Sequence, residues 1–355
     1  MSQKGLVLVT GASGYLGAHV VDQLVKEGYR ARGTVRSGKL SASRDAFSVY
    51  GDAVEIVPLD DLAGGDFTDV LQGVNAVIHV AAPMTEPNVE RALEVAVDGS
   101  LNVLRQAEKA GITNFAYVSS IVAVTTRFLF GDYSPLSDNE NSMKEWSPIT
   151  KEEILNKKDA DVFTIYIAEK VLSEKAVWEF AEQHPHIELT TVNPPFFYGP
   201  FAPGHRGPHE IGNVSVASMS SMNLFWNLLD ATGSAVPYPQ LVDVRDVARS
   251  LVAALTAPPT SKVGRKRILV SGEWVNQSEI LKLVEKERPE LLGRISKAVK
   301  EDKSTVVKSV VDQKRVREVL GIEVRPWQET VLDAIDALID LEKEWKGRGV
   351  TLARA

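Results

Sequence analysis

The chain contains no cysteine, and this absence alone excludes several kinds of protein. Without a thiol there can be no disulfide, no cysteine nucleophile and no cysteine-bound zinc or iron–sulfur cluster. An excess of positive charge is also missing, since 40 lysines and arginines against 47 acidic residues give a net charge of −7. This balance argues against a nucleic-acid-binding protein. Neither of the two histidine pairs, at 184/186 and 205/209, is joined by an aspartate or a cysteine at ligand spacing, so we expect no metal site.

Long hydrophobic runs are scarce as well. The longest uncharged stretch, residues 211–229, carries three asparagines and four serines, which a lipid-facing helix disfavours. Only four residues precede the first apolar run, so we expect no secretory signal. With 44% hydrophobic and 25% charged residues, the chain has the composition of an ordinary globular protein, which we expect to be soluble and cytoplasmic.

The N-terminal half alternates β-rich runs with helical patterns. This alternation predicts βαβ units and therefore an α/β fold with a doubly wound parallel sheet of the Rossmann type. The expected strands are 6–10, 30–36, 54–59, 75–80, 115–119 and 188–192, and the expected helices are 15–27, 89–110 and 163–183.

The pattern changes after residue 194. Residues 194–212 contain five prolines and four glycines, which is typical of a loop. Residues 241–255 again predict a strand that leads into a helix, with Asp246 as its N-cap. We therefore expect a nucleotide-binding domain and a smaller, discontinuous C-terminal substrate-binding domain. The expected ranges are 1–194 with 235–260 for the first domain, and 195–234 with 261–355 for the second.

A glycine-rich turn separates the first strand from the first helix. Gly11 suits a tight turn, Gly14 suits a close approach of the backbone to a pyrophosphate, and Gly17 lets the helix pack on the strand. The first helical residues, Tyr15 and Leu16, belong to a helix N-terminus that offers N–H groups and a positive dipole to phosphates. The alternative is a simple strand-to-helix turn without a ligand.

The second predicted strand indicates which dinucleotide binds. NAD-binding proteins usually carry an acidic residue at its end, yet residues 28–44 contain no acidic residue. Arg36 and Lys39 are the best candidates for the 2′-phosphate of NADP, and a solvated basic loop is the alternative. Asp61 and Leu62 are candidates for the adenine edge, or an ordinary loop. The cations of this segment are Arg30, Arg32, Arg36, Lys39 and Arg44.

Tyr166 and Lys170 are four residues apart on a predicted helix and therefore share one face. A free tyrosine has a pKa of about 10, too high for easy proton exchange at neutral pH. We expect the lysine ammonium and the positive nicotinamide ring to lower the pKa of Tyr166, which then gives its proton to a carbonyl oxygen as hydride arrives. A half-buried aromatic beside a solvated lysine is the alternative.

Together these segments resemble the extended short-chain dehydrogenase/reductases, especially the dihydroflavonol reductases, cinnamoyl-CoA reductases and microbial aldehyde or ketone reductases. The resemblance covers residues 5 to 200 specifically and 242–248 more loosely. It implies that Ser120 is the catalytic serine, that Ala81 and Ala82 lie against the cofactor, and that Pro194 and Phe197 lie beside the nicotinamide. Its segments are residues 9–17, 33–37, 79–84, 117–120 and 193–200, and Tyr166 with Lys170.

Three departures from that family stand out. Glu169 occupies the position before the lysine, where relatives usually have serine. Ala96 stands where many relatives have an asparagine, so we expect a triad only. The cinnamoyl-CoA reductase signature around the tyrosine is absent, which makes that substrate less favoured.

These observations predict an NADPH-dependent carbonyl reductase that acts, as a monomer or homodimer, on a small to medium apolar aldehyde or ketone. The nearest alternative enzyme is a nucleotide-sugar epimerase or dehydratase, but Arg206 is the only cation between residues 200 and 244 that could neutralise a diphosphate. A non-catalytic NADP-sensing protein is the other alternative. The residues expected to contact the substrate are Ser120, Thr125, Tyr166, Phe196, Phe225 and Trp226, although the helical spacing of the last two fits core packing by default and a pocket wall as the alternative.

Overall fold

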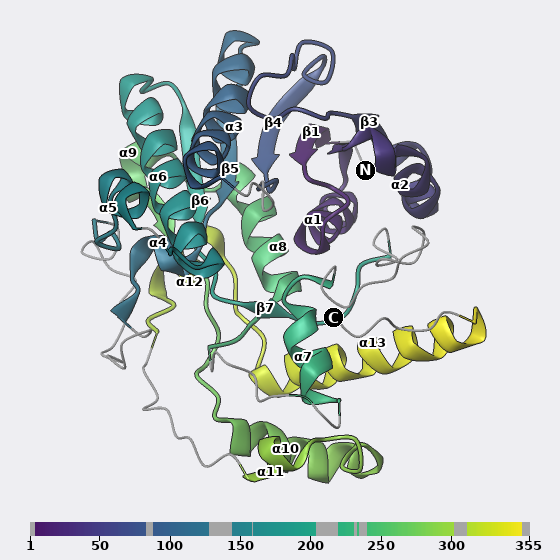
Figure 1. Cartoon of the computed structure of the whole chain (residues 1–355). Coiled ribbons are helices and arrows are strands. Elements are labelled where there is room, and N and C mark those ends of the chain that lie inside the picture. Colours follow the sequence, from purple (N-terminus) through teal and green to yellow (C-terminus); the bar gives the residue numbers. More distant parts are fainter. Residues whose placement is uncertain are drawn as a thin grey trace.

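The computed structural model describes most of the chain. Residues 204–218 of the predicted pocket segment, which include Arg206, lie outside the described residues, as do Pro83 and Met84 of the sequence motif. The described part forms a parallel sheet with helices on both faces and a group of C-terminal helices on the side to which β4 points (Figure 1). The described ranges are 4–82, 88–127, 144–157, 159–203, 219–230, 233, 240–301 and 311–349.

Seven strands pair in parallel in the order β3-β2-β1-β4-β5-β6-β9. The chain winds outward from β1 in one direction and from β4 in the other, which is the doubly wound arrangement, so the predicted fold class is confirmed. A separate parallel pair joins β7 (Phe197–Tyr198) to β8 (Val242–Asp243). The sheet strands are β1 (Lys4–Thr10), β2 (Tyr29–Val35), β3 (Val54–Pro58), β4 (Val74–His79), β5 (Asn114–Val118), β6 (Glu188–Val192) and β9 (Lys266–Ile268).

Alternate side chains of each strand point to opposite faces and build two cores. Val7 and Val9 of β1 belong to the core that includes α1 and α8. Leu6 and Leu8 belong to the core that includes α3 and α6. Both faces of the sheet are therefore covered by helices, as all-parallel sheets require. The helices of this part are α1 (Tyr15–Lys26), α2 (Leu40–Phe47), α3 (Val89–Lys109), α4 (Ile121–Val124), α5 (Lys151–Asn156), α6 (Val162–Gln183) and α8 (Val244–Ala253).

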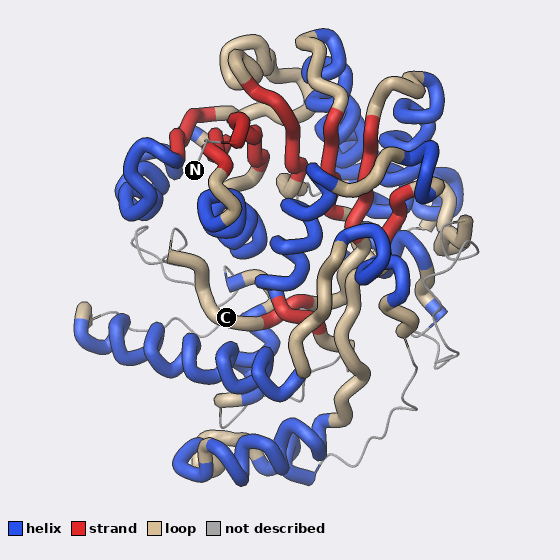
Figure 2. Tube along the Cα trace, turned by 180° about the vertical axis from the view of Figure 1, so that it is seen from behind, coloured by secondary structure: helices blue, strands red, loops and turns tan. Residues whose placement is uncertain are grey.

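Helices α7, α10, α11 and α13 gather beneath the sheet, where the long helix α13 runs between the sheet and the lowest helices, whereas α9 lies level with the sheet (Figure 1 and Figure 2). None of the helices in the described part of the chain has both the length and the hydrophobicity that a membrane crossing needs. The C-terminal helices are α7 (Met222–Leu228), α9 (Thr260–Val263), α10 (Gln277–Glu287), α11 (Lys297–Glu301), α12 (Lys314–Leu320) and α13 (Trp327–Gly347).

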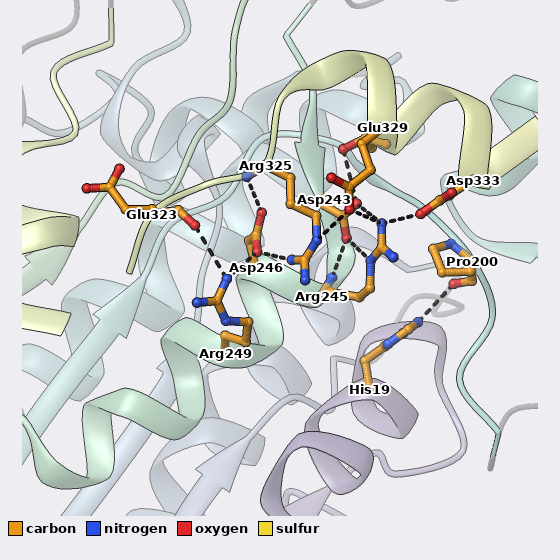
Figure 3. Close-up of polar contacts among 12 residues, drawn as sticks. His19, Pro200, Asp243, Arg245, Asp246, Arg249, Glu323, Arg325, Glu329 and Asp333 are labelled. Carbon is orange, nitrogen blue, oxygen red and sulfur yellow. Dashed lines mark hydrogen bonds and ion pairs between the residues drawn. The ribbon is translucent and has the colours of Figure 1, made fainter. Parts of the chain in front are cut away.

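Two buried carboxylates attach α13 to the start of α8 (Figure 3). Asp243 accepts hydrogen bonds from the guanidinium of Arg245, at 2.8 and 2.7 Å, and from the Thr330 hydroxyl at 3.0 Å. Asp246 accepts the backbone N–H of Arg325 at 2.6 Å. Buried carboxylates are stable only when paired in this way, so these contacts hold the C-terminal helix in place.

Some sequence predictions need correction. The N-cap of α8 is Asp243, whose carboxylate accepts the Arg245 N–H, and not Asp246, which instead binds the segment before α13. The strand β9 lies within residues 261–355, the range expected for the substrate-binding domain, yet it pairs with β6 in the main sheet. The boundary expected at residue 261 is therefore wrong for this strand. Helix α2 was not predicted, because it is short and its buried face consists of small residues, Ser43 and Ala46, and Phe47.

Candidate active site

The glycine turn brings β1, α1 and β4 into close contact. Gly11 has a φ of +73°, and a Cβ at this residue would lie 2.9 Å from the Cα of Ala81. A Cβ at Gly17 would lie 2.1 Å from the carbonyl oxygen of Gly11. Any side chain at either position would push the helix or the end of β4 away from the turn, so both glycines are needed for this geometry. At Gly14 a Cβ would meet the Gly11 oxygen at 3.3 Å, a milder restriction.

Thr10, a residue that sequence reasoning missed, fixes the position of Ala81. Its Oγ1 lies 2.8 Å from Nδ1 of His79 and accepts the backbone N–H groups of Val80 and Ala81, each at 3.2 Å. The ends of β1 and β4 are thereby joined beside the glycine turn. Ala82, which follows, is exposed.

The side chains of Tyr15 and Leu16 are buried, so only their backbone is placed to meet a ligand at the turn. The Tyr15 hydroxyl donates to the carbonyl oxygen of Gly199 at 2.9 Å, and its ring stacks on Phe197 with centroids 6.0 Å apart. Phe197 is therefore held through Tyr15 rather than free to turn. Pro194 is buried and its carbonyl oxygen accepts the Ile121 N–H at 2.9 Å.

Of the predicted cations, only Arg36 and Lys39 lie at the carboxyl end of β2. Burial first, and then the charge of Arg36, lowers the pKa of Lys39, which shows that the two cations are close. The other three are placed elsewhere. Arg30 lies near the amino end of β2, Arg32 donates to Glu55 at 2.8 Å, and Arg44 donates to the carbonyl oxygen of Ile56 at 3.1 Å. The local cationic site therefore has two members, not five.

Asp61 shapes the loop after β3. Its carboxylate accepts the N–H groups of Ala63 and Gly64, both at 2.9 Å, and thus closes a tight turn. Leu62 lines a small cavity that also borders Ala81. The structure thus gives Asp61 a turn-forming role, while Leu62 is close to the residues of the β4 end.

Ser120, Tyr166 and Lys170 come together at the carboxyl end of β5. The hydroxyls of Ser120 and Tyr166 are hydrogen-bonded, and Nζ of Lys170 lies 5.8 Å from the centre of the Tyr166 ring. Helix α6 carries the last two residues and begins at Val162, because the carboxylate of Asp161 accepts the N–H groups of residues 163 and 164. The three residues expected to act together are therefore assembled.

The charges of the protein itself do not lower the pKa of Tyr166 as expected. Burial is the largest effect and raises the pKa, the hydrogen bond from Ser120 lowers it, and the nearby charge of Glu169 raises it. Lys170 is buried, which lowers the pKa of its amine to about 8, while Glu169 and Glu174 oppose this effect. The expected lowering of the Tyr166 pKa thus needs a positive charge that the protein itself does not supply.

A buried ion pair lies behind the triad, and sequence reasoning missed it. Glu174 is one turn beyond Lys170 on α6, and its Oε1 accepts from the Arg267 guanidinium at 2.8 Å. Its Oε2 accepts from the Ser119 hydroxyl at 2.7 Å and from the Asn193 amide at 2.8 Å. These contacts fix the end of β5 just before Ser120 and the end of β6 beside it. The four-residue spacing from Lys170 was a signal for Glu174, but nothing in the sequence pointed to Arg267.

The structure places one of the residues expected to contact the substrate in the hydrophobic core. Thr125 is buried at the end of α4, and Phe196 is half-buried. Phe225 has no exposed surface and packs on Tyr198 with centroids 4.6 Å apart, so the structure places it in the core and not on a pocket wall. Trp226 is half-buried against Trp345 of α13, at 5.8 Å between centroids. Helical spacing could not distinguish core from wall at these positions.

Comparison with known proteins places this geometry in a family. The model of the NAD dependent epimerase/dehydratase family matches residues 7–270, well over half of the chain. The chain belongs to the NAD-dependent epimerase/dehydratase family. The predicted membership of the extended short-chain dehydrogenase/reductases is therefore confirmed.

Several members of this family are similar over nearly their whole length. An uncharacterised oxidoreductase of Schizosaccharomyces pombe is 35% identical over 81% of this chain and 84% of its own length. The NADPH-dependent methylglyoxal reductase GRE2 of Saccharomyces cerevisiae is 28% identical over 95% of this chain and 98% of its own. The crystal structure of yeast methylglyoxal/isovaleraldehyde reductase Gre2 with NADPH has a TM-score of 0.78 at 26% identity, covering 95% and 99% of the two chains.

Proposed function

We propose that this protein is an NADPH-dependent carbonyl reductase that reduces a small to medium apolar aldehyde or ketone to the alcohol. The observation that carries the proposal is the assembly of Tyr166, hydrogen-bonded to Ser120 and flanked by Lys170, at the same sheet edge as the glycine turn. Relatives named as NADPH-dependent methylglyoxal reductases support the reaction class.

The glycine turn fits a dinucleotide cofactor. The absence of a Cβ at Gly11 and Gly17 leaves the backbone accessible at the start of α1, where a pyrophosphate is stabilised by N–H groups and the helix dipole. Bound NADPH supplies the hydride. Ala81 and Leu62 border the cofactor, and Lys170 binds the nicotinamide ribose hydroxyls.

Each member of the triad has a task in the proton-transfer step. Ser120 donates a hydrogen bond to the oxygen on which negative charge develops. Tyr166 gives its phenolic proton to that oxygen, and the O–H bond that breaks in the tyrosine forms in the alcohol. The ammonium of Lys170 stabilises the phenolate that remains, because an opposite charge nearby favours the ionised form.

Arg36→Ala is expected to raise KM for NADPH much more than KM for NADH. Arg36 and Lys39 are the two cations at the carboxyl end of β2, and a guanidinium binds a phosphate in a bidentate way. Losing one charged hydrogen-bonded contact costs about 1.5–3 kcal/mol, roughly a tenfold to hundredfold rise. Steady-state kinetics with both cofactors test this. An Arg30→Ala control, at the other end of the strand, should leave the ratio of the two KM values as it is, whereas an unchanged ratio in Arg36→Ala contradicts the assignment.

The substrate is proposed to be uncharged. Phe196, Phe197 and Phe201 are half-buried at the segment after β6, and the printed sequence has only Arg206 as a cation between residues 200 and 244. An epimerase or dehydratase must instead neutralise a nucleotide diphosphate. Stabilisation of the protein by a UDP-sugar, and not by aldehydes, in a thermal-shift screen would favour that alternative.

The proposal is tested by following NADPH absorbance with aldehydes, α- and β-ketoesters and aryl ketones. Oxidation of NADPH with at least one apolar aldehyde or ketone, and slower reaction with NADH, is the expected result. Tight NADPH binding without oxidation over the whole panel would instead indicate a non-catalytic NADP-sensing protein. The monomeric or homodimeric state and the cytoplasmic location stay predictions.

A further inference from the structure

A small cavity borders Lys170 and shares Leu62 and Ala81 with the proposed cofactor site. It measures about 10 Å³, close to the space needed for one water. Glu169 and Lys170 of α6 both line it, as does Ala96 of α3. The cavity thus brings an acidic residue and the lysine of the triad to one enclosed space.

The hydroxyl groups around this cavity are already engaged. Tyr117 donates to Ser173 at 3.0 Å, Ser173 donates to the backbone oxygen of Glu169 at 2.6 Å, and Ser100 donates to the backbone oxygen of Ala96 at 2.9 Å. Within the described residues, the Glu169 carboxylate itself forms no hydrogen bond or ion pair. The Glu169 side chain is half-buried, so it lines the cavity and still contacts solvent.

The groups that face Glu169 from neighbouring elements do not change charge near neutral pH. His79 of β4 is buried, which lowers its pKa to about 3, and Tyr117 of β5 has its pKa raised by burial to about 12. The cavity-lining residues contributed by α3 and by the loops after β3 and β4 are all uncharged: Ala96, Gly99, Ser100, Leu62, Ala81 and Ala82.

On α6 itself, two groups remain that titrate near neutrality. Burial raises the pKa of Glu169 to about 7, and burial lowers that of Lys170 to about 8. The charge of Glu169 opposes the second effect, and it also raises the pKa of Tyr166. Glu174 acts on Lys170 as well, but it is bound to Arg267.

We propose that the Glu169 carboxylate, as one wall of this cavity, keeps Lys170 charged and Tyr166 protonated and so sets the upper pH limit of the reaction. Glu169 is a positioning residue that acts through these two neighbours. Glu169 becomes negative around pH 7, below the pH at which the buried lysine loses its proton. The negative charge of Glu169 raises the pKa of Lys170 and the pKa of Tyr166, so both groups keep their protons as the pH rises. The inference rests on the proposed reductase function.

The first test uses the protein without cofactor. The ¹³Cε resonance of Lys170 is followed against pH in labelled protein and assigned with Lys170→Met. In Glu169→Gln the midpoint is expected to fall by about one pH unit, because an adjacent opposite charge is lost. Glu169→Ser, which restores the family residue, should show the same fall, and Glu169→Asp should largely prevent it. Glu179→Gln, an exposed carboxylate on the same helix, serves as the control.

The second test uses kcat/KM for reduction against pH. The alkaline limb is expected to move down by about one pH unit in Glu169→Gln and to stay in place in Glu179→Gln. An unchanged Lys170 midpoint overturns the inference. A shifted midpoint with an unshifted alkaline limb overturns its link to the reaction. If no carbonyl compound oxidises NADPH, the proposed function fails, while the resonance still tests the coupling between Glu169 and Lys170.

Discussion

Replacing Tyr166 by Phe is expected to lower kcat for carbonyl reduction by roughly two to four orders of magnitude. The variant keeps the ring beside Lys170 but removes the only atom that can pass a proton to the substrate oxygen from this position. Hydride transfer alone would leave an alkoxide with no proton donor beside it, which is unfavourable. The measurement is the steady-state rate of NADPH oxidation at saturating cofactor.

Two controls make this result specific. NADPH affinity, measured by fluorescence, should stay within about twofold, because the phenolic oxygen contributes to the proton step rather than to the glycine turn. Tyr29→Phe removes a hydroxyl near the amino end of β2, far from the carboxyl ends of the strands, and should keep full activity. A Tyr166→Phe protein with near-normal kcat would refute the role of Tyr166 as proton donor.

Arg267→Met is expected to lower the free energy of unfolding by about 3–5 kcal/mol. Glu174 has no exposed surface and Arg267 is 2% exposed, so the variant leaves a carboxylate buried without its cation. Burial itself raises the pKa of Glu174, but Arg267, Ser119 and Asn193 outweigh it and lower the pKa. Because the folded pKa is lowered, the ionised pair stabilises the protein above the unfolded pKa of about 4.3, and this contribution is lost as the pH falls.

Urea unfolding monitored by circular dichroism measures this loss. Lys262→Met, an exposed cation before the same strand, should change stability by less than about 0.5 kcal/mol. The double variant Arg267→Met/Glu174→Leu should recover much of the stability, because it removes the unpaired charge along with its partner. An Arg267→Met protein as stable as the wild type would show that the pair does not hold the segments around Ser120.

Local features of the chain were predictable from the sequence. The run ending at Thr10 and the glycines at 11, 14 and 17 specify a strand, a tight turn and a helix start through neighbouring residues alone. The spacing of Tyr166 and Lys170 placed both on one helix face for the same reason. The structure agrees closely with the expected strands and long helices, since their signal is a periodicity within a single element.

The charge pattern of the sequence was less informative, because residues of the same charge on one strand can lie at opposite ends of that strand. The cations between residues 28 and 44 looked like one group, but β2 places Arg30 at one end and Arg36 at the other. Arg32 forms an ion pair with Glu55 on the neighbouring strand β3. Counting the charges in a stretch of sequence ignores where each side chain lies, so the count overstates the number of cations that form one site.

By itself, the sequence determined the glycine turn and the placing of Tyr166 and Lys170 on one helix face, because each depends on residues close together in the chain. The alternation of strands and helices indicated the doubly wound sheet, whereas Ser120, far from Tyr166 in the chain, was expected only from the family resemblance. Only the tertiary structure brought Arg267 to Glu174, 93 residues apart, and turned Glu169 toward a cavity that faces Ala96. It also placed Phe225 in the core. Contacts of this kind arise when separate elements pack, and no periodicity or spacing within one element encodes which partners will meet.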